Sequence, residues 1–74
     1  MKLSKIQKIL PGWERIRVWG KDDEHPLYDG AVEDLPIALA DLKFKKSNDT
    51  GSYFDIRYDC SDIAAHVAVF VQEN

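Results

Sequence analysis

Residues 13–19 read Trp13-Glu14-Arg15-Ile16-Arg17-Val18-Trp19, and this stretch decides the fold class. Its side chains alternate between two sides, with the period of two that is typical of a half-buried β-strand. Glu14, Ile16 and Val18 share one side; the tryptophans and arginines share the other. The stretch therefore predicts a strand with one apolar face and one mixed, basic-aromatic face.

A short helix is expected before this strand, over residues 3–10. Its apolar residues recur at helical spacing, and Pro11-Gly12 ends it. Ser4 and Gln7 have the spacing of a capping box. A helix of this length does not persist alone in water, so its apolar face must pack on the rest of the domain.

Four later segments have strand character: residues 26–32, 42–46, 53–59 and 66–72. Asp29-Gly30 predicts a tight turn or a bulge in the first of them.

Two connections are expected between these strands. Residues 47–51 (Ser-Asn-Asp-Thr-Gly) predict a hairpin loop. Residues 33–41 are ambiguous, with Asp34 a candidate cap for a helix of one or two turns.

The expected fold is α+β, a short N-terminal helix packed on a four- or five-stranded, mainly antiparallel β-sheet. One domain is expected over residues 1–74, because a chain of this length supports a single core. The expected inner residues are Ile16, Val18, Leu42, Phe44, Phe54, Ile56, Tyr58, Val67, Val69 and Val71, closed by Leu3, Ile6 and Leu10.

The composition indicates the class of protein and its cellular compartment. The chain is 45% hydrophobic with eight aromatic residues, which is typical of a folded protein. Its one cysteine, Cys60, excludes an internal disulfide and favours a reducing compartment. It has no apolar run of the length that a membrane span or a signal segment needs. We therefore expect a soluble cytoplasmic protein.

The charges are segregated along the chain, although the net charge is only −3. Seven carboxylates and no lysine or arginine fall in one window, Asp22, Asp23, Glu24, Asp29, Glu33, Asp34 and Asp41. One interpretation is that these carboxylates decorate turns and keep the domain soluble. The functional interpretation is an acidic surface that steers and binds a basic partner. The predicted contacts are Asp22, Asp23, Glu24, Asp29, Glu33 and Asp34, with Tyr28 as an aromatic anchor.

The basic-aromatic strand face is an alternative interaction site. Aromatic rings stack on bases and arginines pair with phosphates, so Trp13, Arg15, Arg17 and Trp19 are candidates for binding single-stranded nucleic acid. Packing of this face under a helix is the more ordinary use of such residues. Direct nucleic-acid binding is therefore the second hypothesis.

Catalytic and metal-binding patterns are weak. Asp59, Cys60, Asp62 and His66 supply ligand atoms without the repeated Cys and His pairs of a zinc site. Residues 22–25 lack the spacing of a calcium loop. A Cys60–His66 pair has no recognisable third group to orient it. We expect no catalytic residues, no metal, no cofactor and no enzymatic activity.

The segment Pro26-Leu27-Tyr28-Asp29-Gly30-Ala31-Val32-Glu33-Asp34-Leu35-Pro36, with the opening Leu3-Ser4-Lys5-Ile6, resembles small uncharacterised proteins of Gram-positive bacteria and their phages. That resemblance implies an α+β fold and a mobile-element setting, with the host cytoplasm as location. Phage genes of this size often encode inhibitors of host defence, including anti-CRISPR proteins.

By that analogy we expect a protein-binding accessory protein, an anti-CRISPR-like inhibitor that mimics nucleic acid and engages a basic nucleic-acid-handling enzyme such as a Cas nuclease. A third hypothesis is a small structural or oligomeric component, either monomer or homodimer. Its dimer would form through an exposed strand edge such as Ala65 to Val71.

Overall fold

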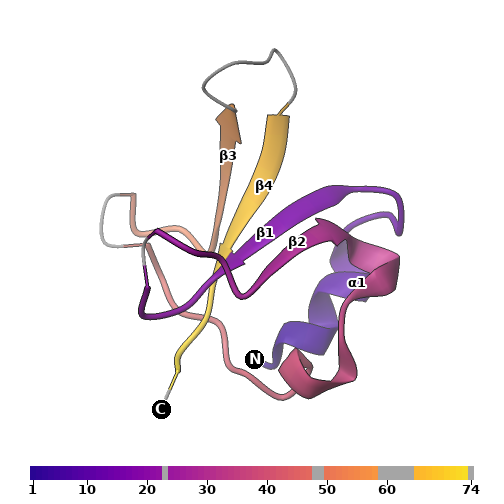
Figure 1. Cartoon of the computed structure of the whole chain (residues 1–74), viewed down its shortest axis with the longest axis horizontal. Helices are drawn as coiled ribbons and strands as arrows, with labels where there is room; N and C mark the ends of the chain where they lie inside the picture. Colours follow the sequence, from indigo (N-terminus) through magenta and orange to yellow (C-terminus); the bar gives the residue numbers. More distant parts are fainter. Residues whose placement is uncertain (23, 48–49, 59–64, 74) are drawn as a thin grey trace.

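The computed structural model describes residues 1–22, 24–47, 50–58 and 65–73. It is an α+β fold, as predicted, with a short helix packed on a four-stranded sheet (Figure 1). The strands are β1 (Arg15–Trp19), β2 (Tyr28–Ala31), β3 (Phe54–Tyr58) and β4 (Ala65–Phe70). The helical elements are η1 (Leu3–Lys5), α1 (Ile6–Ile9), η2 (Val32–Asp34) and η3 (Ile37–Leu39).

The N-terminal helix lies where it was predicted, but the predicted capping box is absent. It begins as the 3-10 turn η1 and continues as α1, and Leu10 is already extended. The capping box is wrong, because Ser4 lies inside η1 and neither helix has a side-chain cap. The Gln7 amide instead donates to Val32 O at 3.4 Å, which ties α1 to η2.

The sheet order is β2-β1-β4-β3, and the sheet is mixed. β2 pairs with β1, and β3 with β4, in antiparallel fashion, but the central pair β1–β4 is parallel, with Ile16 opposite Val67 and Val18 opposite Val69. The prediction of a mainly antiparallel sheet therefore holds for the outer pairs only. It also follows that residues 65–71 lie between β1 and β3, so the expected dimer edge at Ala65 to Val71 is not available.

One face of the sheet forms the core with the helix. The buried apolar residues in contact there are Leu3, Ile6, Ile16, Val18, Val32, Leu35, Phe44, Val69 and Val71. Ile56 was expected among them and is 73% exposed instead. Figure 1 shows why: β3 and β4 extend away from α1, so the helix does not cover this end of the hairpin. The expected inward position of the Tyr58 side chain lies outside the described part.

The predicted loop at residues 47–51 is closed by backbone bonds, since Ser47 N donates to Ser52 O at 2.8 Å and Gly51 N to Ser47 O at 2.9 Å. The segments on its two sides do not pair with each other, however, so it is not the turn of a β-hairpin. Lys45 N donates to Phe70 O at 2.8 Å, and Gln72 N donates to Lys43 O at 2.8 Å, so residues 43–45 pair with the end of β4. Phe54 then pairs with Val69, the next residue back along β4. The two segments therefore lie end to end along the same side of β4, and residues 46–53 are an excursion between them. Asn48 and Asp49 lie outside the described residues.

Two local expectations are also corrected. Asp29 and Gly30 form neither a turn nor a bulge, because they pair in regular register with Arg17 and Ile16. Residues 33–41 contain two 3-10 turns instead of an α-helix. Asp34 is the last residue of η2 and caps nothing. Proline at position 36, between the turns, has no N–H and keeps them from merging.

Candidate functional site

The acidic residues of the central window occupy separate places in the fold. Asp22 and Glu24 lie in the loop that joins β1 to β2, and Asp23 lies outside the described residues. Glu33 and Asp34 lie on η2, which follows the other end of β2. The two groups are therefore at opposite ends of the β1–β2 ribbon. Asp41 lies apart from both and pairs with Lys2 at 3.4 Å.

The carboxylate of Asp22 organises its own loop. It accepts the backbone N–H of Glu24 at 2.8 Å and that of His25 at 3.3 Å, and it lies 3.1 Å from His25 Nδ1. These bonds lower the pKa of Asp22, first through the Glu24 N–H and then through the His25 side chain. Asp22 thus has a structural task besides any contact with a partner.

Asp29 is held by the two arginines of β1. Its oxygens lie 3.4 Å from Arg15 Nε and 3.1 Å from Arg17 Nε. The register explains this, because Asp29 is directly opposite Arg17 and two positions from Ala31, the partner of Arg15, on the same face of the sheet. Asp29 is therefore compensated inside the fold, and this contact was not predicted because it depends on the β1–β2 register.

Glu33 and Asp34 are exposed on a turn that is firmly anchored. Their neighbours Val32 and Leu35 are buried in the core. Val32 N donates to Glu14 O and Glu33 N donates to Gly12 O, both at 3.0 Å. Among the residues that the structure describes, no lysine, arginine or histidine lies within ion-pair distance of either carboxylate. Glu33 and Asp34 are therefore uncompensated carboxylates on a turn that backbone hydrogen bonds and buried neighbours hold in place.

Tyr28 is half-buried, and its hydroxyl is engaged inside the fold. The hydroxyl donates to Ala31 O at 2.6 Å, and the ring lies over Gly30. Burial raises the pKa of Tyr28 above 10.0, and the charges of Asp34 and Asp29 raise it further. The Tyr28 hydroxyl thus holds Ala31, the last residue of β2 before η2, and the nearby carboxylates of Asp34 and Asp29 raise the pKa of Tyr28.

The raised pKa of Tyr28 predicts a loss of stability at alkaline pH. The folded state favours the neutral phenol, so its contribution is present below the ordinary pKa of 10.0 and is lost as pH rises through the raised value. In a spectrophotometric titration, the transition that Tyr28→Phe removes should lie above pH 10. If the transition that Tyr28→Phe removes lies at or below pH 10, this assignment is contradicted.

The basic-aromatic face of β1 is not an open row of rings and cations. Trp13 is 75% exposed but precedes the strand, whereas Trp19 is half-buried. Arg15 and Arg17 contact Asp29, and Arg57 on the same face contacts Asp55 at 3.7 Å. The face is thus a mixed ionic network, which is less suited to phosphate than an uncompensated basic groove.

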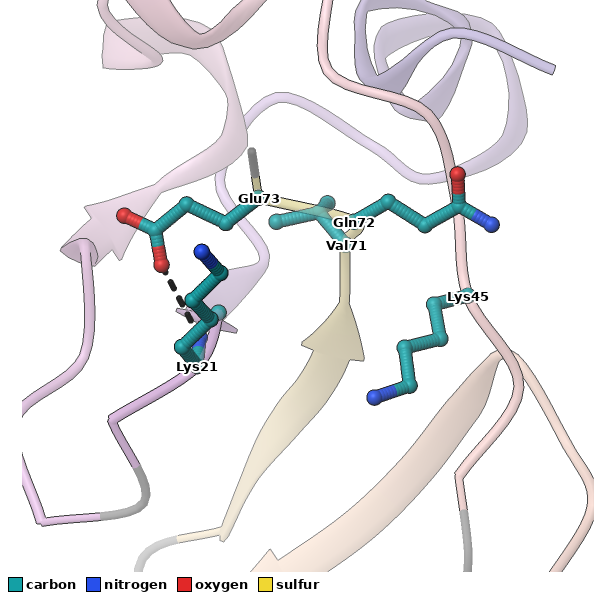
Figure 2. Close-up of a pocket in the computed structure, with 6 residues that line it drawn as sticks. Lys21, Lys45, Val71, Gln72 and Glu73 are labelled. Carbon is teal, nitrogen blue, oxygen red and sulfur yellow. Dashed lines mark hydrogen bonds between the residues drawn. The ribbon is translucent and has the colours of Figure 1, made fainter.

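A shallow hollow of about 320 Å³ lies where the end of β1, residue 45 and the C-terminal end of the described chain meet (Figure 2). It is lined by Gly20, Lys21, Lys45, Val71, Gln72 and Glu73. Glu73 Oε2 accepts the backbone N–H of Lys21 at 2.9 Å. This hollow could not be predicted, because the residues that line it are up to 53 positions apart, from Gly20 to Glu73. It offers flexible amines and one engaged carboxylate, not a nucleophile with a base.

The candidate metal and thiol residues are largely outside the described part. Of Asp59, Cys60, Asp62 and His66, the structure describes only His66, which is buried in β4. Within residues 1–22, 24–47, 50–58 and 65–73, no group of three metal-ligating side chains comes together. The predicted absence of metal, cofactor and catalysis stays a prediction.

The chain matches no protein family, no curated protein and no solved structure with which it was compared. The resemblance to small phage-associated proteins therefore stays a prediction. In the described part of the chain, no helix has the length and apolar character needed to cross a bilayer.

Proposed function

We propose that this chain is a non-enzymatic protein-binding protein that contacts a basic partner through the acidic turn η2. The observation that supports this most is the pair Glu33 and Asp34, exposed and uncompensated on a turn whose flanks are buried. A rigid backbone lowers the entropy lost on binding, so fixed charges give more affinity than charges on a flexible loop.

The neighbourhood of η2 adds to this proposal. Glu14 lies beside the turn through the Val32–Glu14 backbone bond, and the carboxylate of Glu33 lies over Gly12. Tyr28 supplies an amphipathic ring at the adjoining strand end, the kind of residue that is common in binding hot spots. Asp22 and Glu24 form a second acidic group, which would contact the partner only if it spans the β1–β2 ribbon.

The partner class follows from charge complementarity. Enzymes that handle nucleic acid present positive grooves for phosphates, and fixed carboxylates can occupy such a groove in their place. A nucleic-acid-handling enzyme is therefore the proposed target, with a Cas nuclease as the most concrete example. Inhibition of that enzyme would follow from occupation of its groove.

Charge reversal at η2 tests this proposal. Glu33→Lys and Asp34→Lys should each weaken capture of a basic bacterial nucleic-acid enzyme about tenfold or more, which corresponds to about 1.4 kcal/mol. Asp41→Lys is the matched control, because it makes the same charge change at an exposed residue that pairs with Lys2. Captured proteins would be identified from lysate treated with nuclease, and affinities measured with the purified partner at two salt concentrations.

The loop residues are tested separately by reversing Asp22, Asp23 and Glu24 to lysine. A partner that spans the ribbon loses affinity in both sets of variants, whereas one confined to η2 loses it only in the η2 set. Thermal stability of the Glu33 and Asp34 variants should change little, because surface substitutions are usually within about 0.5 kcal/mol. Capture that is undiminished by both Glu33→Lys and Asp34→Lys would refute the proposal.

A further inference from the structure

The outer edge of β3 is open. β3 is the last strand in the sheet order, and its only strand partner is β4. Among the described residues, no backbone hydrogen bond from another segment reaches its outer side. Figure 1 shows β3 on the free side of a hairpin that extends beyond the helix. Such an edge presents unpaired N–H and C=O groups to a further strand.

The direction of these groups follows from the hydrogen bonds at the end of β4. Phe70 O and Gln72 N bond residues 45 and 43 on the β3 side, whereas Val71 N bonds Trp19 O on the β1 side. Backbone groups alternate along a strand, so the even-numbered residues of β4 face β3. Their partners in register are Asp55 and Arg57. The N–H and C=O groups of Phe54, Ile56 and Tyr58 therefore point outward.

The side chains of β3 are self-complementary about Ile56. Asp55 and Arg57 flank it with opposite charges on one face of the sheet, and Ile56 itself is 73% exposed on the other face. The side chain of Arg57 is 41% exposed and that of Asp55 12% exposed, and the two lie 3.7 Å apart. Asp55 also accepts a hydrogen bond from the Thr50 hydroxyl at 2.8 Å, so the partner's Arg57 would approach the remaining exposed part of the carboxylate. Asp55 and Arg57 are equally spaced about Ile56. An antiparallel copy of the same strand, aligned at Ile56, therefore places each Asp55 opposite the other copy's Arg57.

We propose that this edge binds the β3 edge of a second copy of the chain, antiparallel, with the two-fold axis at Ile56. Ile56 then pairs with Ile56 of the partner copy, and each Phe54 pairs with the partner's Tyr58 through the outward backbone groups. Asp55 of each copy lies opposite the partner's Arg57 in a non-hydrogen-bonded pair, where side chains approach most closely. The product is one continuous sheet of two four-stranded halves.

Charge selects this register over its neighbours. A two-fold axis at Asp55 would place two aspartates opposite each other, and an axis at Arg57 would place two arginines opposite each other. Like charges directly across a strand pair are destabilising, and opposite charges contribute about 0.2–1 kcal/mol. Both Ile56 side chains emerge on the same face and cover each other. Because each copy uses its β3 edge once, the assembly closes at two chains.

The oligomeric state of the full chain tests this proposal. Sedimentation across a range of concentrations should show a monomer–dimer equilibrium. Ile56→Lys should weaken dimerisation at least tenfold, because it places two cations at the axis. Ile37→Lys is the matched control, since Ile37 is 91% exposed on η3 and outside the proposed interface. It should leave the equilibrium unchanged.

Two further variants test the register. Asp55→Arg should weaken the dimer, and the exchange Asp55→Arg with Arg57→Asp should restore it, because the opposite pairs re-form in reverse. With Cys60 replaced by serine, Ile56→Cys should form an intermolecular disulfide on mild oxidation, since directly paired residues have Cα atoms within disulfide range. Ile37→Cys should not.

Three outcomes would overturn the proposal. A wild-type chain that is monomeric at all concentrations removes it, and an extended segment of another protein then becomes the candidate for the same edge. A dimer unaffected by Ile56→Lys places the interface elsewhere. A dimer that Asp55→Arg weakens but the exchange does not restore excludes the proposed register. None of these outcomes bears on capture of a basic partner through η2, so the two proposals are separable.

Discussion

Replacing Ile16 by alanine is expected to lower the free energy of unfolding by about 2–5 kcal/mol. Ile16 is fully buried on β1, which is paired on both sides, with Gly30 across one edge and Val67 across the other. Removing its branched side chain loses apolar burial and leaves a cavity that a sheet interior cannot easily close. A domain of this length has only about 4–11 kcal/mol of stability in total. The variant should therefore be partly unfolded at physiological temperature.

The measurement is urea unfolding followed by circular dichroism, with Ile37→Ala as the control. Ile37 is the same residue type but is 91% exposed, so its truncation should change stability by no more than about 0.5 kcal/mol. Equal losses in the two variants would mean that β1 does not carry the core in the way described.

The substitution Gly30→Ala is expected to cost about 1–3 kcal/mol although it adds only one methyl group. A Cβ at position 30 would lie 2.6 Å from the Tyr28 hydroxyl oxygen and 2.9 Å from its ring carbon Cζ. The ring would have to move off the strand, and its hydrogen bond to Ala31 O would break. The glycine is thus required by the ring above it, not by an unusual backbone conformation.

A double-mutant cycle separates the clash with the Tyr28 ring from any general cost of alanine at position 30 of β2. In a Tyr28→Ala background the ring is absent, so adding Gly30→Ala should have little further effect. The displaced phenol should also titrate closer to its ordinary pKa of 10.0, because it leaves the buried site beside Asp34 and Asp29. A full cost of Gly30→Ala in both backgrounds would contradict the packing of Tyr28 over Gly30.

The individual strands could be predicted because alternation is a local property of the chain. Ile16 and Val18 are buried and Arg15 and Arg17 lie on the other face, as the pattern indicates. The parallel pairing of β1 with β4 could not be predicted, since residues 16 and 67 are separated by most of the chain and no local signal links them. For the same reason the sequence did not show that residues 43–45 and β3 both pair with the β4 segment, instead of with each other as a hairpin.

The errors of burial have a different cause. Ile56 has an inward strand position but lies beyond the reach of a helix that ends at Ile9, so alternation gave its face correctly and its exposure wrongly. Val32 and Leu35 were missed because their burial depends on 3-10 turns with no clear periodicity. Patterning predicts which side a residue takes, and only the tertiary fold determines what covers that side.

The acidic window shows the same limit at the candidate site. The clustering of its carboxylates along the chain is visible in the sequence. Asp29, however, is compensated by Arg15 and Arg17 only because β1 and β2 pair in one register. Asp41 pairs with Lys2 through the fold of the N-terminal segment. The residues left uncompensated on η2 emerge only after these pairings are known.

The parallel pairing at the centre of the sheet has a consequence for how the chain is made. β1 is synthesised well before β4, so among the described strands β1 has only β2 as a neighbour until residues 65–71 have been translated. A ribosome that stalls or terminates before that point releases a chain whose central apolar row is open to water. Such a product would be a substrate for proteases, and its lifetime in the cell should be far shorter than that of the complete sheet.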